Sequence, residues 1–539
     1  MNRPAEPDAS AWGEKPTVAV GFSPHVRADV VAVAIPVIAG AIAAAIELGP
    51  RSLWLDEAST FSIVSQHGSA LWHGIKGDGG NQLAYYLLMH FVVAWFGHAA
   101  WVMRLPSVLA TAVTGGLVAA IALRLFDNRR IAVAAGLLTV ISVSLVYWGQ
   151  NARGYAILVT LSVGSFLALI AILETPADRS PSRGAVIAYV LTTLAALYVG
   201  YDVALLIPAQ LALLLLFRER ARLVIGCLAL VLVLCVPLLV LAEERGSGQL
   251  FWVTPLSWRV AYQAAVTLLS AGAPPNFHNT STTVAAAIVT ALAVLAAIVV
   301  AARAALPARR RPGSWPVLLL LSWVVVPTVL TLVVYAAGEP IELSRVTILV
   351  MPALGLLLGW LLLRPGVVPA LGLAALAVLL ALRLLQLIPS YGVSPEPWDA
   401  ATAYVLASTP ADQSACLVFY PQDGREPFDY YLRAFRPSAA SDPAPSLRPI
   451  LPSLAWTTVK PFVEVYGTIG AGQLARTAQT CQRLWLIGSH EGQAHGTSES
   501  RANLTRYLQL EHELRRLYPH TSLRSFGWAS PIHVRLLYR

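Results

Sequence analysis

Long uncharged runs of Ala, Leu, Val and Ile recur along most of the sequence and constrain the fold more than any other feature. A membrane-spanning helix needs roughly 20 mainly apolar residues. With 56% hydrophobic and only 12% charged residues, the chain is too apolar for a soluble enzyme and too poor in charge for a disordered protein. The sequence therefore predicts a polytopic α-helical membrane protein. Eleven runs are expected to cross the bilayer: residues 30–48, 101–123, 131–148, 155–173, 185–200, 203–217, 223–242, 283–302, 315–336, 346–363 and 366–388.

A further apolar segment, residues 83–97, is about 15 residues long and is predicted to lie in the membrane interface. The loop arginines support this choice. If this segment does not cross and the N-terminus is cytoplasmic, the arginines divide as the positive-inside rule requires. The cytoplasmic loops then hold Arg124, Arg129, Arg130, Arg179, Arg183, Arg218, Arg220, Arg222, Arg303, Arg309, Arg310, Arg311 and Arg364. The opposite side, beyond its first loop, holds only Arg153, Arg245, Arg259 and Arg345.

This topology divides the chain into three parts. Residues 1–28 form a cytoplasmic tail, and residues 29–388 form the membrane domain, whose first extracytoplasmic loop is 49–100. Residues 389–539 are more polar and form an extracytoplasmic α/β domain. Its expected strands are 416–420, 484–488, 522–526 and 532–538, its expected helices are 397–407, 428–435, 472–482 and 502–518, and 437–452 is expected to be a loop. The protein is thus expected in the cytoplasmic membrane, and the formal charge of +9 is attributed to loop arginines rather than to nucleic-acid binding.

Cys416 and Cys481 each precede or open a predicted strand of this outer domain. If the two strands are neighbours, the sulfur atoms can meet in a compartment that permits oxidation. A disulfide and two buried free thiols are both compatible with the sequence. Cys227 and Cys235 lie within one span and are expected to be packing residues.

Ionisable residues are scarce, so those near the outer membrane boundary are candidates for function. Asp56 and Glu57 follow the first span directly. Adjacent carboxylates on a helix point in different directions, so one can act on a substrate while the other supports it. The alternative is that both stabilise the N-terminus of an interfacial helix.

Further polar residues are expected at the same membrane face. Asp78 lies in a Gly-rich turn before Tyr85 and Tyr86, and Arg153 lies in the segment YWGQNARGY between two spans. An outward arginine suits a phosphate partner, although snorkelling to lipid phosphate explains it equally well. Asp202 and the pair Glu342 and Arg345 extend this set.

The order of these motifs resembles the GT-C superfamily of glycosyltransferases, which use polyprenyl-phosphate sugars. The residues that carry the resemblance are LWLDEAS at 53–59, WFG at 95–97, MRLPS at 103–107, YWGQNARGY at 147–155, and Ser344 with Arg345. The bacterial relatives of protein O-mannosyltransferases and of lipid A aminoarabinose transferases are the most similar branch. In the outer domain, EPWD at 396–399 and FDYYL at 428–432 are similar to segments of that branch.

The resemblance implies a role for each matched residue. Asp56 would be the general base, Glu57 would support it, and Arg345 and Arg153 would bind the donor phosphate. The remaining candidates for substrate contacts are Asp78, Asn81, Tyr85, Tyr86, Gln150, Tyr155, Asp202 and Glu342. The segment 81–84 replaces a family stretch, and Asn151 stands where relatives often have an acid, so no acidic role is assigned there.

The implied activity is transfer of a monosaccharide, with mannose favoured, from a polyprenyl-phosphate donor to an extracytoplasmic protein, lipid or polysaccharide, with inversion. No cofactor is required, but Asp56 and Asp78 are candidate ligands for a divalent cation. Two other functions stay open at this stage. One is a transporter or flippase for a lipid-linked sugar, and the other is an inactive scaffold that binds the cell envelope.

Overall fold

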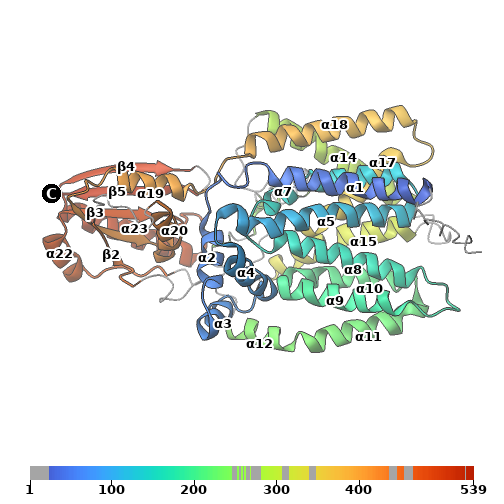
Figure 1. The fold of residues 1–539 in the computed structure, drawn as a ribbon, viewed down its shortest axis with the longest axis horizontal. Helices are drawn as coiled ribbons and strands as arrows, with labels where there is room; N and C mark the ends of the chain where they lie inside the picture. The colour runs from blue at the N-terminus through green and yellow to red at the C-terminus, as the bar shows by residue number, and fades with distance from the viewer. Residues whose placement is uncertain are drawn as a thin grey trace, which may run out of the picture.

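The computed structural model describes residues 24–245, 252–253, 256–258, 260–262, 268, 281–305, 315–338, 347–435, 446–454, 465–527 and 530–539. A helical bundle forms one end of the molecule, and a smaller domain with a β-sheet forms the other (Figure 1). Most of the expected tail at 1–28 lies outside the described residues, as do Glu342 and Arg345.

Every predicted apolar run contains a helix or a pair of helices. Within the described part of the chain, six helices are long and apolar enough to cross a membrane: α1 (Pro24–Ala45), α5 (Ala100–Phe126), α8 (Tyr155–Leu173), α14 (Ser281–Ala305), α15 (Trp315–Ala336) and α18 (Pro369–Leu387). Two bent pairs raise the number to eight: α6 (Arg129–Val140) with α7 (Val143–Gly149), and α11 (Arg218–Leu234) with α12 (Val236–Arg245). The other predicted runs form shorter apolar helices: α9 (Arg183–Val199), η1 (Tyr201–Leu206) with α10 (Ile207–Leu213), and η5 (Ile348–Val350) with α17 (Met351–Leu363). The polytopic architecture is confirmed, and the count of eleven stays a prediction.

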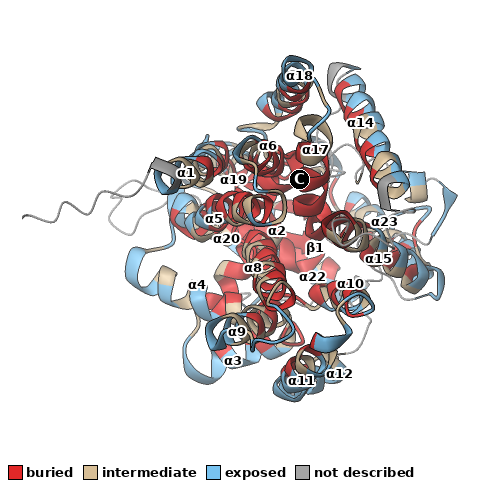
Figure 2. Cartoon of the chain, turned by 90° about the vertical axis from the view of Figure 1, so that its right-hand side faces the viewer, coloured by how far each residue is buried: buried red, intermediate tan, exposed pale blue. Residues whose placement is uncertain are grey.

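Close crossing of three helices organises the first half of the bundle. Gly115 on α5 and Gly136 on α6 both face Pro36 of α1, and a Cβ on either glycine would come within 2.7 Å of a Pro36 atom. Small residues allow membrane helices to approach in this way. Elsewhere, Phe166 of α8 stacks on Trp323 of α15 at 3.6 Å between ring centroids. Figure 2 shows the buried residues gathered in the middle of the bundle and the exposed residues on its outer faces.

Three short helices lie between the bundle and the sheet domain: α2 (Leu55–Val64), α3 (Gly68–Gly77) and α4 (Leu83–Phe96) (Figure 1). Helix α4 corresponds to the segment predicted to lie in the interface. It buries Tyr85, Tyr86 and Met89 but exposes Phe91 and Trp95. An exposed apolar face with aromatic rings suits a helix that lies along a membrane surface.

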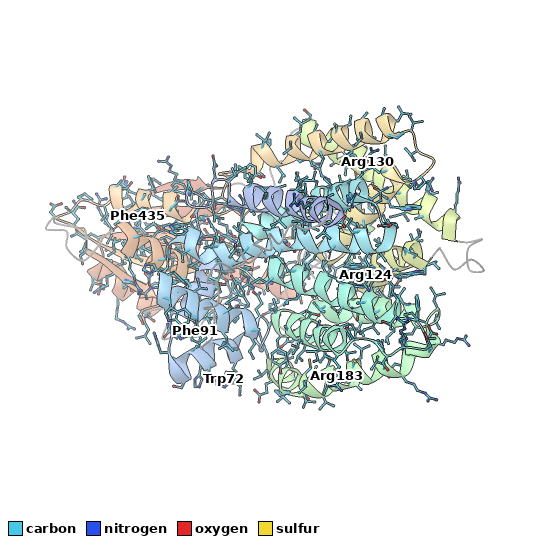
Figure 3. The ribbon with its side chains drawn as sticks, turned by 45° about the vertical axis from the view of Figure 1, so that its right-hand side comes forward. Trp72, Phe91, Arg124, Arg130, Arg183 and Phe435 are labelled. Atoms are coloured by element: carbon cyan, nitrogen blue, oxygen red, sulfur yellow. A yellow bond between two sulfur atoms is a disulfide. The ribbon has the colours of Figure 1, made fainter. Side chains whose placement is uncertain are left out.

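Three of the arginines that the positive-inside argument assigns to one side, Arg124, Arg130 and Arg183, lie toward the end of the bundle away from Phe435 of the sheet domain (Figure 3). Two ion pairs lie among these loops, Arg124 with Glu174 at 2.5 Å and Arg129 with Asp29 at 2.6 Å. The bundle therefore has an arginine-rich end and an end that carries the sheet domain.

The sheet domain has three layers. Its strands are β1 (Ser414–Tyr420), β2 (Ser446–Leu451), β3 (Arg483–Gly488), β4 (His520–Phe526) and β5 (Ile532–Tyr538), in the order β2-β1-β3-β5-β4. Strands β2, β1 and β3 are parallel, whereas β5 is antiparallel to β3 and β4. Alternate strand residues pack against α19 (Trp398–Ala407) and α20 (Arg425–Phe435) on one face and α22 (Ala471–Thr480) and α23 (Ser498–Leu517) on the other.

The prediction of a loop over 437–452 was wrong in its second half, because residues 446–451 form β2. The sequence there contains Pro449, which argues against a central strand. Strand β2 is an edge strand, where a missing N–H is tolerated, and its register with β1 shifts beside Leu417, the partner of Pro449.

A disulfide joins Cys416 of β1 to Cys481, the second residue before β3, with 6.0 Å between the Cα atoms. Strands β1 and β3 are neighbours in register, which brings the two cysteines together. Cys227 and Cys235 are buried free thiols.

Candidate functional site

Helix α2 carries the two adjacent carboxylates in its first turn, where negative charge favours the helix N-terminus. The two side chains point to different parts of the molecule, since successive helical positions are about 100° apart. Glu57 is completely buried, whereas the Asp56 side chain is 21% exposed. The pair thus divides into an inner and an outer carboxylate.

The inner carboxylate, Glu57, is held by a buried arginine of α5. Arg104 donates from Nε to Oε1 at 2.8 Å and from Nη2 to Oε2 at 2.6 Å, and the Ala152 N–H donates to Oε1 at 2.7 Å. Arg104 also donates to three backbone carbonyls of the first loop: Leu48, Arg51 and Ser52. Glu57 therefore fixes the start of α2 against the turn that contains Arg153.

The outer carboxylate, Asp56, lies beside Arg153, with 3.6 Å between Oδ2 and Nε. Arg153 is 98% buried and donates from Nη1 to the Tyr86 hydroxyl at 3.3 Å. Tyr86 in turn donates to Oδ2 of Asp78 at 2.9 Å. A connected series of polar groups thus runs from Asp56 through Arg153 and Tyr86 to Asp78.

A second arginine binds the other oxygen of Asp78. Nη1 of Arg245, the last residue of α12, lies 2.9 Å from Oδ1 and also donates to the Gly77 carbonyl. Gly79 and Gly80 have positive φ, and a Cβ on either would come within 2.9 Å of Arg245 or Leu241. The glycines therefore permit both the turn and the close approach of α12.

Burial changes the acid–base properties of this cluster. Desolvation raises the pKa of Asp78 to about 6, and the guanidinium groups of Arg245 and Arg153 limit the rise. Desolvation also raises the pKa of Tyr86, so its hydroxyl stays protonated and donates to Asp78. Two carboxylates and two arginines therefore share one site, which can bind an anion and accept a proton.

Other residues predicted to contact the substrate make hydrogen bonds or packing contacts within the protein. Gln150 donates from Nε2 to the Ile46 carbonyl at 2.6 Å, and the Tyr155 ring packs on Trp148 with 4.2 Å between centroids. Tyr85 is buried beside Tyr86. The Asn81 backbone N–H donates to the Asp78 carbonyl at 3.1 Å.

Asp202 lies in η1 beside Tyr201, whose hydroxyl donates to the Gly79 carbonyl. Asn151 accepts the indole N–H of Trp54 at 2.7 Å, so the amide at this position joins the DE segment to the turn before Arg153.

Three residues of the site were missed from the sequence. Arg245 was counted only as a loop arginine, Arg104 only as part of a matched motif, and Gln82 only as a departure from the family pattern. Gln82 is buried and accepts the Gly154 N–H at 3.0 Å. The signal for Arg245 was present, since it belongs to the small group of arginines on the side opposite the arginine-rich loops.

The carboxylates of this site are contacted by arginine and tyrosine side chains. Both oxygens of Asp78 already accept from Arg245 and Tyr86, and Arg153 lies between Asp78 and Asp56. Within the described ranges, no three His, Cys, Asp or Glu side chains form a metal-binding group. The cations that neutralise these carboxylates are arginines.

Comparison with known proteins supports the resemblance seen in the sequence. Residues 82–241 match the family model described as dolichyl-phosphate-mannose-protein mannosyltransferase. This range includes Tyr86 and Arg153 and ends shortly before Arg245. No curated protein matches the chain.

Solved structures with the same arrangement include ArnT from Cupriavidus metallidurans bound to undecaprenyl phosphate. The TM-score is 0.54 at 14% identity, over 94% of this chain and 97% of ArnT. The chain has the GT-C fold. The Archaeoglobus fulgidus oligosaccharyltransferase tethered to an acceptor peptide gives a TM-score of 0.51 at 13% identity, over 87% of this chain and 69% of the other. AglB from the same organism, in complex with an inhibitory peptide and a dolichol-phosphate, gives 0.50 at 11% identity with the same coverage.

The predicted resemblance to the GT-C superfamily is therefore confirmed. At these identities the neighbours establish the fold, and the chemistry depends on the residues of this chain.

Proposed function

We propose that this protein transfers a monosaccharide from a polyprenyl-phosphate donor to an acceptor on the outer side of the cytoplasmic membrane. The observation that carries the proposal is the pairing of Asp56 with Arg153 at 3.6 Å, where the first loop meets the bundle. A carboxylate that can accept a proton and a guanidinium that can bind a phosphate then lie within one substrate length of each other.

The reaction is a single displacement at the anomeric carbon. The acceptor oxygen forms a bond to that carbon as the bond to the phosphate oxygen breaks, and the polyprenyl phosphate leaves with the electron pair. Asp56 removes the acceptor proton, and Arg153 and Arg245 stabilise the negative charge on the leaving phosphate. The product is inverted at the anomeric carbon.

Each supporting residue has a definite task in this scheme. Glu57 positions Arg153 through the Ala152 N–H, and Tyr86 and Asp78 orient the two arginines. Arg345, at the start of a late predicted span, is the second phosphate ligand that the resemblance implies. The lipid donor also agrees with the neighbours, since ArnT was solved with undecaprenyl phosphate and AglB with a dolichol-phosphate. Mannose is the favoured sugar because of the family model at 82–241.

A transfer assay with matched variants tests the proposal. Purified protein in lipid nanodiscs is incubated with a panel of radiolabelled polyprenyl-phosphate monosaccharides and an envelope acceptor extract. We expect transfer from one donor, a loss of at least about 10²-fold in Asp56→Asn, and normal activity in Asp127→Asn. Asp127 is a suitable control because it follows α5 with a left-handed backbone that Asn also adopts.

The other outcomes are equally informative. Activity of Asp56→Asn near that of the wild type would exclude Asp56 as the base. Donor binding without transfer by the wild-type protein would favour a lipid-linked sugar transporter or an inactive scaffold over an enzyme.

A further inference from the structure

The residue directly before Asp56 is held by a carboxylate of the sheet domain. Glu396, two residues before α19, is 99% buried, and its Oε2 accepts the backbone N–H of Leu55 at 3.1 Å. The same oxygen accepts the indole N–H of Trp398 at 3.1 Å, and Oε1 lies 3.3 Å from Nε2 of His490. Glu396 is therefore fixed from its own domain and reaches into the first loop.

The carboxylate of Glu396 accepts a hydrogen bond from a backbone N–H that has no acceptor within α2. Leu55 is the first residue of α2, and the N-terminal N–H groups of a helix have no acceptor within the helix. The residue at the N-cap position is Trp54, which makes no side-chain cap. Glu396 thus supplies from a distant part of the chain the acceptor that Ser or Asp usually supplies locally.

Two neighbouring contacts hold the segment before α2 in the same way. The Leu53 N–H donates to the Tyr431 hydroxyl at 2.6 Å, and the Ser52 hydroxyl accepts the Asp399 N–H at 3.2 Å. Alternate backbone N–H groups, those of Leu53 and Leu55, are therefore bound by the sheet domain just before the acidic pair.

A second carboxylate of the domain contacts the next turn of α2. Ser59 donates to Glu426 of α20, so carboxylates of the sheet domain contact both the first residue of α2 and the residue four positions later. Glu57 is bound from the opposite side by Arg104 of the bundle. The first turn of α2 is thus clamped between two domains, with Asp56 between the two contacts.

We infer that Glu396 is a positioning residue for Asp56, and that the sheet domain in this way forms part of the active site. This inference rests on the proposed role of Asp56. Because a displacement of about 1 Å in a reacting group can reduce the rate about 10²-fold, the contact acts on turnover rather than on donor binding. The proposed donor phosphate ligands are Arg153, Arg245 and Arg345. Among the described residues, the Glu396 carboxylate contacts Leu55, Trp398 and His490 instead.

Three variants test this inference in full-length protein in nanodiscs. Glu396→Ala removes the acceptor, Glu396→Gln keeps an oxygen for the Leu55 N–H, and Leu55→Pro removes the N–H itself. Proline is tolerated at the first position of a helix, and Trp54 already has the extended backbone that a following proline requires. Glu513→Ala, on the partly exposed side of α23, is the matched control.

The readouts are kcat and KM for the donor that the wild-type protein uses, and the affinity for undecaprenyl phosphate. We expect Glu396→Ala to reduce kcat by about tenfold or more with donor KM and undecaprenyl phosphate affinity within about threefold of the wild type. Glu396→Gln should restore most of the turnover. Leu55→Pro should resemble Glu396→Ala, and the double variant should be no slower than either single variant, because both changes remove one contact.

Several results would overturn the inference. These are an unchanged kcat in Glu396→Ala, a loss confined to donor KM, or losses that simply add in the double variant. The proposed function fails separately, when Asp56→Asn transfers sugar as well as the wild type does. If Glu396→Ala folds poorly, the inference is tested by comparing Glu396→Gln with Leu55→Pro. Only the proline variant should then lose turnover.

Discussion

The guanidinium group of Arg104 forms two parallel hydrogen bonds to the carboxylate of Glu57, and neither side chain is exposed to solvent. Arg104 belongs to α5 of the bundle and Glu57 to α2 of the first loop. Since a buried ion pair leaves an uncompensated charge when one partner is removed, this pair makes the position of α2 sensitive to a single substitution.

We expect Arg104→Met to destabilise the protein by about 3–5 kcal/mol, because it removes the charged partner of Glu57 and the donor to three backbone carbonyls. Thermal unfolding in detergent measures the change. A matched substitution, Arg124→Met, removes a half-exposed arginine of an ion pair and should cost at most about 1 kcal/mol. Equal effects of the two substitutions would contradict the importance of burial here.

The raised pKa of Asp78, about 6, predicts a pH dependence of donor affinity. Below pH 6, Asp78 is neutral, so the cluster with Asp56, Arg153 and Arg245 changes from neutral to positively charged and binds an anion more tightly. Affinity for a polyprenyl phosphodiester, whose own charge is constant, should therefore weaken as pH rises through about 6. Titration calorimetry from pH 5 to 8 measures it, and Asp78→Asn should abolish the dependence. A retained dependence in that variant would assign it to another group.

The raised pKa of Asp78 also predicts that the folded protein becomes less stable as the pH rises. Because the pKa of Asp78 lies above its ordinary value of 3.8, the folded protein holds a proton between about pH 4 and 6 that the unfolded chain releases. The contribution of Asp78 to the free energy of unfolding is therefore most favourable near pH 4 and is lost as the pH rises through about 6. Comparing the melting temperature of the wild type with that of Asp78→Asn across this range isolates the contribution.

The Cys416–Cys481 disulfide closes a loop with a sequence separation of 65 residues. The chain-entropy model gives about 4 kcal/mol of stabilisation for a loop of this length. We expect the Cys416→Ser, Cys481→Ser double variant to lower the stability of the sheet domain, and reductant to lower the stability of the wild type but not of the double variant. Peptide mapping that finds both thiols free in the native protein would contradict this expectation.

At Arg383, unlike at Arg104, we expect that removing the charge does not lower the stability of the protein. It lies on the inner face of α18, is 1% exposed, and its Nε and Nη1 have no hydrogen-bond partner among the described residues. An uncompensated buried charge is costly, so Arg383→Met should leave the melting temperature unchanged or raise it. Arg364→Met, which removes a cation over the Trp360 ring, serves as the comparison. A marked loss of stability in Arg383→Met would show that this arginine has a necessary partner.

The sequence predicts features that depend on local composition and fails for those that depend on distant contacts. The apolar runs located the long helices of the bundle among the described residues, and segment length together with the arginine distribution predicts that α4 lies in the interface. Strand β2 was missed because Pro449 and the adjacent Ser and Pro residues are typical of a loop, and only pairing with β1 makes the segment a strand.

The candidate site shows the same division. Asp56, Asp78 and Arg153 were expected at one membrane face, because Asp56 and Arg153 stand beside predicted spans and Asp78 precedes the predicted interfacial segment. The structure links them through Tyr86. Arg245 and Glu396 are separated from their partners by 167 and 341 residues. The sequence marks Arg245 as an outward arginine and Glu396 as part of the EPWD segment, but no local pattern indicates which distant residue each of them contacts.

The separation of 341 residues between Leu55 and Glu396 also sets an order of events during synthesis. At a translation rate of roughly 5–20 residues per second, the first loop emerges roughly 17–70 s before the carboxylate that caps its helix exists. Until then, the Leu55 N–H at the start of α2 lacks this acceptor. A chain that stops after the last predicted span would therefore lack the acceptor for the Leu55 N–H, and we expect its turnover to be reduced at least as far as that of Glu396→Ala.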